Sequence, residues 1–171
     1  SDTAIAAIGA GASLINFTGP RASNALLARV RDEIATLSLT YMPYGDAYAM
    51  RDAAPVPYRI GAILAHLEPR IARARDAGVE LDKLIIDPNL GIIHPATSDF
   101  AKTHLQLEVL AHNEDIRALG CPLLLYAARK PERLARILIA ELVLRAKPEY
   151  VRTHEPQTIR ELQAAAQDAQ R

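Results

Sequence analysis

The stretch Lys83-Leu-Ile-Ile-Asp-Pro88 has an apolar centre closed by an Asp-Pro turn. An apolar run of this length is typical of a β-strand buried on both sides, as in a parallel sheet covered by helices. Similar short runs alternate with helical periods before and after it. Strands are expected at 13–18, 37–42, 83–87, 122–126 and 149–153, and helices at 3–11, 23–37, 60–78, 99–119, 131–146 and from 156 onward, with a loop at 45–57. This alternation predicts an α/β fold with a parallel sheet, either a barrel or an open doubly wound sheet.

The placement of glycines separates these two architectures. No Gly-x-Gly-x-x-Gly motif follows any expected strand, and Gly9-Ala-Gly11 comes before its strand rather than after it. A dinucleotide-binding doubly wound sheet carries that motif directly after its first strand. A barrel is favoured, because polar residues stand at the carboxyl ends of the expected strands, where a (β/α)8 barrel builds its active site.

Composition and charge narrow the class of protein. The 171 residues suit one domain, and 20 Lys plus Arg balance 20 Asp plus Glu. A balanced chain offers no basic surface for nucleic acid or for a membrane. The single Cys121 excludes a disulfide framework and suits a reducing cytoplasm. Neither 5–17 nor 134–144 has the pattern of a targeting signal or a membrane span, so a cytoplasmic enzyme or ligand-binding protein is expected.

The polar residues at the strand ends are the candidates for a functional site. They are Asn16, Thr40, Tyr41, Asp87, Asn89, Arg129, Lys130, Arg152 and His154. The last four form two pairs of cations at places where helices are expected to begin. A positive charge there is repelled by the helix dipole, which lowers the stability by roughly 0.3–1 kcal/mol for each charge. An anion such as phosphate among them would remove that cost. Two plainer interpretations stay open: Asn16 and Asp87 as turn-forming residues, and the cations as solvated side chains.

The remaining ionisable residues carry weaker signals. Three histidines lie in amphipathic helices and are expected on surfaces or between helices: His66, His104 and His112. His94 faces the expected site from its loop but has no partner at metal-ligand spacing. The arginine-rich run 70–75 is interpreted as an ordinary solvated helix face. Cys121, directly before a buried strand, is expected to be packed rather than reactive.

Five short motifs follow one another along the chain. They are Ser1-Asp-Thr3, Leu14 to Gly19, Leu84 to Gly91, Pro122 to Lys130 and Tyr150 to Glu155. In this order they resemble the ends of barrel strands three, four, six, seven and eight of the pterin-binding enzymes, and of dihydropteroate synthases most closely. The fourth motif, Pro-Leu-Leu-Leu-Tyr-Ala-Ala-Arg-Lys, is similar to the family's Pro-Val-Leu-Val-Gly-Thr-Ser-Arg-Lys. The resemblance covers almost the whole chain.

The resemblance implies an α/β architecture. The expected fold is a partial (β/α)8 TIM barrel with parallel strands that lacks the first two strands. Residues 1–171 would form a single pterin-binding domain that is incomplete at its N-terminus. Missing strands would leave the outermost strands without neighbours. A homo-oligomer or a complementary chain is therefore expected to cover the gap.

The resemblance also implies roles for single residues. Asp2, Asn16, Asp87 and Lys130 would hold the pterin, Arg129, Arg152 and His154 would hold the diphosphate, and Lys130, Arg152 and His154 would act in catalysis. The implied reaction of folate biosynthesis is displacement of diphosphate from hydroxymethyl-dihydropterin by an arylamine, which is p-aminobenzoate in the family. Mg²⁺ is the cofactor that the family implies, although the loop that usually supplies its ligand is absent from the sequence.

Departures from the family pattern keep two alternatives open. Ala128 and Pro131 replace serines of the strand-seven motif, and Asn89-Leu-Gly-Ile-Ile93 replaces a segment that contains glycine and phenylalanine in the family. The first alternative is a methyltetrahydrofolate methyltransferase of the same superfamily, whose reaction has no diphosphate to neutralise. The second alternative is a non-catalytic pterin-binding or assembly subunit.

Overall fold

The computed structural model describes residues 1–45, 49–127 and 130–168. Its strands are β1 (Leu14–Phe17), β2 (Thr36–Thr40), β3 (Leu84–Asp87), β4 (Leu124–Tyr126) and β5 (Tyr150–Arg152). Its helices are α1 (Asp2–Gly9), α2 (Asn24–Asp32), α3 (Ala49–Asp52), α4 (Ile60–Asp76), the 3-10 turn η1 (Leu81–Lys83), α5 (Asp99–Ala111), α6 (Asn113–Arg117), α7 (Arg133–Arg145) and α8 (Pro156–Asp168). The β-α alternation expected from the sequence is confirmed. Within the described residues, none of these helices has the length and apolar character needed to cross a membrane.

The strands are parallel and lie side by side in the order of the sequence. β1 pairs with β2, β2 with β3, and β4 with β5. An isolated parallel bridge between Ile86 and Leu123 connects the two parts, and the Ile86 N–H donates to the Pro122 carbonyl at 2.9 Å. A doubly wound sheet reverses its strand order at a switch point. The described strands lie in the order of the sequence without such a reversal. Strands in the wall of a barrel have this order.

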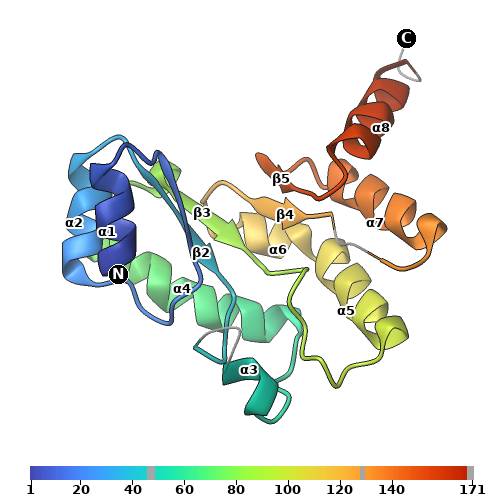
Figure 1. The fold of residues 1–171 in the computed structure, drawn as a ribbon, viewed down its shortest axis with the longest axis horizontal. Helices are drawn as coiled ribbons and strands as arrows, with labels where there is room; N and C mark the ends of the chain where they lie inside the picture. The colour runs from blue at the N-terminus through green and yellow to red at the C-terminus, as the bar shows by residue number, and fades with distance from the viewer. Residues whose placement is uncertain (46–48, 128–129, 169–171) are drawn as a thin grey trace.

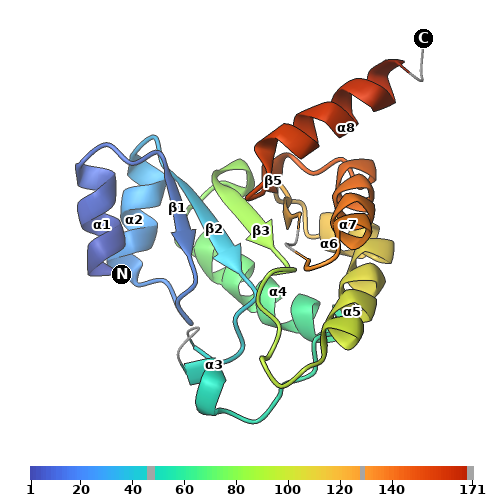
Figure 2. The same ribbon diagram turned by 45° about the vertical axis from the view of Figure 1, so that its right-hand side comes forward.

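Helices α1, α2, α4, α5 and α7 stand along one side of the row of strands. Figures 1 and 2 show α1, α2 and α4 packed beside β1–β3, with α5 and α7 beside β4 and β5. β1 and β5 lie at the two ends of the row, and in the described residues β1 pairs only with β2 and β5 only with β4. Leu14 of β1 and Tyr150 of β5 are 42% and 40% exposed. Both ends of the sheet are therefore open edges.

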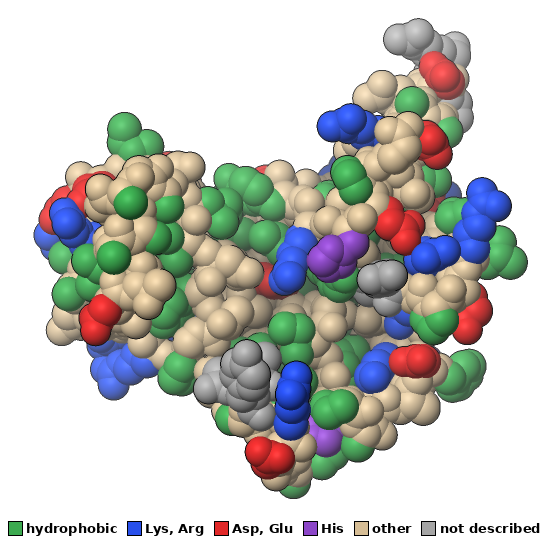
Figure 3. All heavy atoms as spheres, in the orientation of Figure 1, with side chains coloured by type: hydrophobic (Ala, Val, Ile, Leu, Met, Phe, Trp, Pro, Cys, Tyr) green, Lys and Arg blue, Asp and Glu red, His purple; other side chains and the backbone are tan. Residues whose placement is uncertain are grey.

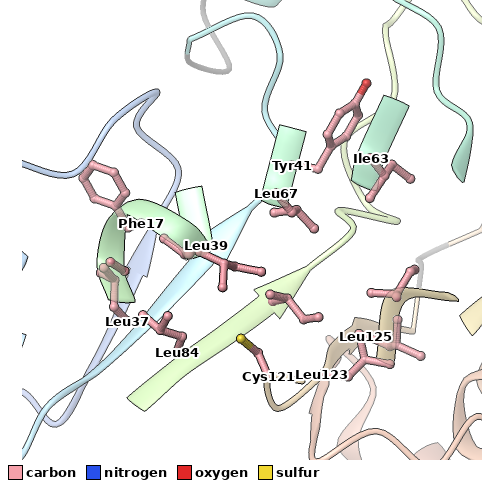
Figure 4. Packing of buried hydrophobic residues seen from close by; sticks show 14 of the residues in the cluster. Phe17, Leu37, Leu39, Tyr41, Ile63, Leu67, Leu84, Cys121, Leu123 and Leu125 are labelled. Carbon is pink, nitrogen blue, oxygen red and sulfur yellow. The ribbon is translucent and has the colours of Figure 1, made fainter. Parts of the chain in front are cut away.

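Alternation along the strands separates an apolar outer face from an inner face. The outer face consists of buried residues that pack against the helices: Ile15, Phe17, Leu37, Leu39, Leu84, Ile86, Leu123 and Leu125. Figure 4 shows this cluster, with Ile63 and Leu67 of α4 on the helix side. Each fully buried Leu or Ile contributes roughly 1.5–3 kcal/mol relative to an exposed one. This layer fixes the register of the strands and leaves the inner face for polar residues.

Several expected boundaries were wrong. The helix expected at 23–37 ends at Asp32, so Ile34, which fits its period, lies in the connection to β2 and is 96% exposed. Its N-terminus was right, since the Ser23 side chain accepts from the Leu26 N–H. The helix expected at 99–119 is interrupted at His112, where the Asn113 side chain donates an additional hydrogen bond to the Leu110 carbonyl.

Two further boundaries differ near the candidate site. The segment 45–57, expected to be a loop, contains the short helix α3, while 46–48 lie outside the described residues. Helix α7 begins at Arg133, so Pro131 precedes the helix and does not stand in its first turn. Lys130 is consequently held by the β4–α7 connection and not by the end of a helix.

Candidate functional site

The inner face brings together side chains from all five strands. Asn16 pairs with Ser38, Thr40 with Asp87, and Tyr126 with Arg152. Because the strands are parallel, their carboxyl ends meet at the same edge of the sheet. We call the set formed by Asn16, Thr40, Asp87, Tyr126, Lys130, Arg152 and His154 the strand-end site.

Asn16 and Thr40 form one side of the strand-end site. The Thr40 hydroxyl donates to the Asn16 amide oxygen at 3.3 Å. Thr40 is buried, whereas Asn16 is exposed on the inner face. This bond orients the Asn16 amide, whose oxygen accepts and whose NH₂ group donates hydrogen bonds.

Asp87 is the buried acid of the strand-end site and is only 3% exposed. Its carboxylate accepts from the Asn89 N–H at 2.7 Å, and the Asn89 amide donates to the Tyr41 carbonyl at 2.8 Å. Burial raises the pKa of Asp87 to about 6, although the Asn89 N–H and the Arg152 charge act in the opposite direction. Asp87 therefore starts a turn, as the plainer interpretation proposed, and also offers a buried carboxylate to the inner face.

A second buried group, Tyr58, supports this turn. Its hydroxyl donates to the Pro88 carbonyl at 3.1 Å. Burial raises the pKa of Tyr58 well above its ordinary value, and the charge of Asp87 adds to that shift. The phenol stays protonated and holds the peptide that follows Asp87. Sequence reasoning missed Tyr58, because a tyrosine in a proline-rich connection carries no pattern that reveals its partner.

Lys130 lines a cavity of about 280 Å³ next to the strand ends. The cavity is lined by Gly91, Ile93, Asp99, Lys102, Gln106, Tyr126, Lys130 and Pro131. The Lys130 side chain is buried, and this burial lowers its pKa, with smaller effects from the charges of Asp99 and Lys102. A buried ammonium in a cavity is a hydrogen-bond donor for a ligand oxygen or nitrogen.

Arg152 and His154 meet at the ring of Tyr126. The Arg152 guanidinium carbon lies 5.4 Å from the centroid of the Tyr126 ring, and the His154 ring stands edge-on to it at 5.8 Å. Both side chains are exposed. In Figure 3, Lys/Arg and His side chains lie next to each other at the rim of a hollow in the middle of this face. An anion could approach these two side chains from solvent.

The remaining predicted site residues lie in different settings. Asp2 is the first residue of α1 and is exposed, and the bond from the Ser23 N–H to the Ser1 hydroxyl holds this end beside the loop after β1. Arg129 lies outside the described residues, so its predicted role stays a prediction. Lys130 and the Arg152–His154 pair both adjoin Tyr126, one through the cavity and the other through ring contacts.

His94 and Cys121 have structural surroundings. The His94 ring accepts from the Ala96 N–H and lies 3.0 Å from the Ala53 carbonyl, so it connects two loops. Burial raises the pKa of Cys121 to about 11, in agreement with a packed thiol. Among residues 1–45, 49–127 and 130–168 there is no group of three His, Cys, Asp or Glu side chains that could hold a metal ion. The expectation of Mg²⁺ stays a prediction.

Arg70 corrects the interpretation of 70–75 as a solvated helix face. Its guanidinium donates to the Thr40 carbonyl at 2.6 Å and to the Gly19 carbonyl at 2.7 Å, so α4 is tied to the ends of β1 and β2. It also lies 3.0 Å from the His66 ring nitrogen. His66 is thus placed against a strand end, where burial and the Arg70 charge lower its pKa.

Replacing Arg70 with Met should lower the free energy of unfolding by roughly 3 kcal/mol, because each hydrogen bond from a charged group contributes about 1.5–3 kcal/mol. Arg70→Lys should recover only part of this loss, since one ammonium cannot reproduce the planar fork that reaches two carbonyls. Arg75→Met, an exposed position on the same helix, is the matched control. Urea unfolding gives the free energy of unfolding of all three variants. Equal values for Arg70→Met and Arg75→Met would show that the hydrogen bonds of Arg70 do not stabilise the fold.

The comparisons with known proteins agree with this fold. No family model matches the chain. In sequence, it is 30% identical over 129 residues to the type-2 dihydropteroate synthases of Escherichia coli and Shigella flexneri, an alignment that covers 68% of this chain and 46% of each relative. The chain therefore spans about half the length of the curated relatives it matches.

Solved dihydropteroate synthases share the fold. The Thermus thermophilus enzyme in complex with 4-aminobenzoate superposes with a TM-score of 0.72 at 21% identity, covering 95% of this chain and 69% of that one. The Xanthomonas albilineans enzyme with 4-aminobenzoic acid gives 0.75 at 23% identity, with 99% and 64% covered. The Coxiella burnetii enzyme in complex with pteroic acid gives 0.72 at 20% identity, with 95% and 62% covered. The chain is thus dihydropteroate synthase-like in sequence and in fold, as its motifs indicated.

Proposed function

We propose that this chain carries the pterin- and diphosphate-binding part of a dihydropteroate synthase-like transferase. The observation that carries the proposal is the strand-end site at the carboxyl ends of the parallel strands. It combines the buried Asp87 carboxylate and the buried Lys130 ammonium with the exposed side chains of Arg152 and His154. The reaction would join hydroxymethyl-dihydropterin diphosphate to an arylamine and release diphosphate. The likeness to enzymes solved with 4-aminobenzoate and pteroic acid supports this choice of ligands.

The residues present suit the parts of that substrate. Asp87 would accept hydrogen bonds from the aminopyrimidine N–H groups, with Asn16 and Asp2 as further polar partners, and Lys130 would donate to the ring carbonyl. As the amine nitrogen bonds to the methylene carbon, the carbon–oxygen bond to the diphosphate breaks and negative charge grows on the leaving oxygen. Arg152 and His154, with Arg129 by resemblance, would stabilise that charge. The amine loses its extra proton to solvent.

We further propose that β1 to β5 correspond to strands four to eight of a (β/α)8 barrel. The sequential strand order and the two open edges support this correspondence. Strands pairing with β1 and β5, from this polypeptide or from another, would close the wall. Such partners would also cover Leu14 and Tyr150 on the inner face.

The proposed reaction is tested by incubating the chain with hydroxymethyl-dihydropterin diphosphate and p-aminobenzoate and measuring released diphosphate. Release should depend on the amine and should be lost in Lys130→Gln, whose amide cannot supply the positive charge. Glu114→Gln, an exposed position on α6, is the control and should behave like the parent. Pterin binding without diphosphate release would identify a binding subunit, and cobalamin-dependent methyl transfer from a methylated folate would identify the methyltransferase alternative.

A further inference from the structure

A groove of about 900 Å³ runs between α2 and α4, and its lining residues are different from those of the strand-end site. Four arginines and one acid line this groove: Arg21, Arg31, Arg70, Arg73 and Asp76. A cleft of this size can hold a small organic molecule. The groove thus concentrates positive charge in a chain whose formal net charge is zero.

Three of these arginines lie at one end of the groove. Arg73 donates from Nη2 to the Ala22 carbonyl at 3.3 Å and to the Asn24 amide oxygen at 2.5 Å. These bonds hold Arg73 against the segment that contains Arg21. Arg70 lies about one turn earlier on α4 and donates to two backbone carbonyls. In the described part of the chain, none of these three arginines forms an ion pair with a carboxylate.

The Arg73 guanidinium has unsatisfied donors among the residues that the structure describes. An arginine carries five N–H donors, and the two bonds given above use those on Nη2. The Arg73 Nε atom is buried and has no hydrogen-bond partner within residues 1–45, 49–127 and 130–168. Burial also lowers the pKa of Arg70, so its charge costs free energy without a counter-ion. Phosphate oxygens are strong acceptors for guanidinium groups and would supply the negative charge.

The other end of the groove does not have this excess of positive charge. Arg31 donates to both carboxylate oxygens of Asp32, at 2.7 and 2.9 Å, and Asp76 adds a second negative charge. Arg31 also donates to the Ala77 carbonyl at 3.4 Å. Because Ala77 comes four residues after Arg73, this end lies about one turn of α4 farther along the groove.

We propose that this groove binds a phosphate monoester, with the phosphate between Arg21, Arg70 and Arg73. The organic group would lie over Ala28 and Ala72, which line the groove with small apolar side chains. The uneven charge favours a monoester over a polyanion, because a polyanion needs cations along the whole groove. This site is separate from the proposed transferase reaction.

Phenyl phosphate carries both parts of such a ligand and is the probe, with inorganic phosphate as the comparison. Titration calorimetry of the full chain at constant ionic strength gives the two affinities. Phenyl phosphate should bind more tightly than inorganic phosphate, because its ring covers apolar surface. Arg21→Gln should weaken the binding of phenyl phosphate about tenfold, because it removes a charged hydrogen-bond donor. Arg75→Gln removes the same charge from an exposed position on α4 that does not line the groove, and should keep the parent's affinity.

A second pair of variants tests the groove without removing an arginine. Ala72→Glu adds a carboxylate at an exposed lining position and should weaken binding at least tenfold by repelling the phosphate. Ala65→Glu adds the same side chain two turns earlier on the same face of α4, where it does not line the groove, and should have no effect.

Arg152→Ala separates this groove from the strand-end site. The binding that Arg21→Gln and Ala72→Glu weaken should remain in Arg152→Ala, because the two sites share no lining residue. Parent-like affinity in Arg21→Gln and Ala72→Glu, with binding lost in Arg152→Ala, would assign the anion to the strand-end site and overturn the inference. Undetectable binding of phenyl phosphate by the parent, or binding no tighter than that of inorganic phosphate, would also overturn it.

Discussion

Replacing Asp87 with Asn should raise the free energy of unfolding at pH 8 by about 3 kcal/mol and leave it unchanged at pH 4. The physical reason is that burial raises the pKa of Asp87 from 3.8 to about 6, so the folded chain holds this proton more tightly than the unfolded chain. The stability that the protonated carboxyl provides is fully present below about pH 4. It is lost as the pH rises through about 6, and Asn removes this dependence while keeping an acceptor for the Asn89 N–H.

Urea unfolding of the parent and of Asp87→Asn at pH 4 and pH 8 measures the effect. Asp76→Asn, an exposed acid at the end of α4, is the control and should show no comparable difference. The difference in the free energy of unfolding between Asp87→Asn and the parent could instead be equal at both pH values. In that case ionisation of the Asp87 carboxyl does not destabilise the folded chain.

Replacing Asp87 should weaken ligand binding, although Asp87→Asn stabilises the fold at pH 8. Asp87→Ala and Asp87→Asn should bind 6-hydroxymethylpterin at least about tenfold more weakly, because an unpaired buried N–H on the ligand costs about 1–3 kcal/mol. A gain in stability together with a loss of binding is what a strained functional group produces. Parent-like pterin affinity in both variants would make the assignment of Asp87 to the pterin wrong.

Diphosphate should lose affinity by about tenfold or more in Arg152→Ala, because a hydrogen bond between charged groups contributes about 1.5–3 kcal/mol. Arg152→Lys should recover only part of the loss, since it keeps the charge but not the bidentate fork. His154→Gln should also weaken diphosphate binding, because it removes an imidazole N–H donor from the site.

Titration calorimetry with diphosphate measures these effects. Arg145→Ala is the control, because Arg145 pairs with Glu141 on the surface of α7. Parent-like affinity in His154→Gln would remove His154 from the anion site. Undetectable binding by the parent would leave Arg152 and His154 as ordinary surface side chains.

The parts of this structure that follow from local pattern could be predicted from the sequence. Apolar runs and helical periods gave the order of the elements, and parallel strands necessarily collect their carboxyl ends at one edge, which located Asn16 and Asp87. Arg70 could not be found in this way, because an arginine that points into water and one that bonds a carbonyl 51 residues away look the same in a helical period. Ile34 misled for a similar reason, since its spacing fits the helix but the chain has already turned toward β2.

A Cβ added at Gly91 would overlap the Tyr126 ring atoms Cδ1 and Cε1, and this contact couples the substitutions that the two positions accept. The backbone of Gly91 does not have a positive φ, so it is the neighbouring ring that excludes a side chain there. We expect Gly91→Ala to be destabilising while the tyrosine is present and to be accepted once a smaller residue has replaced the ring. A library that randomises positions 91 and 126 together should therefore yield folded combinations that single substitutions starting at 91 do not.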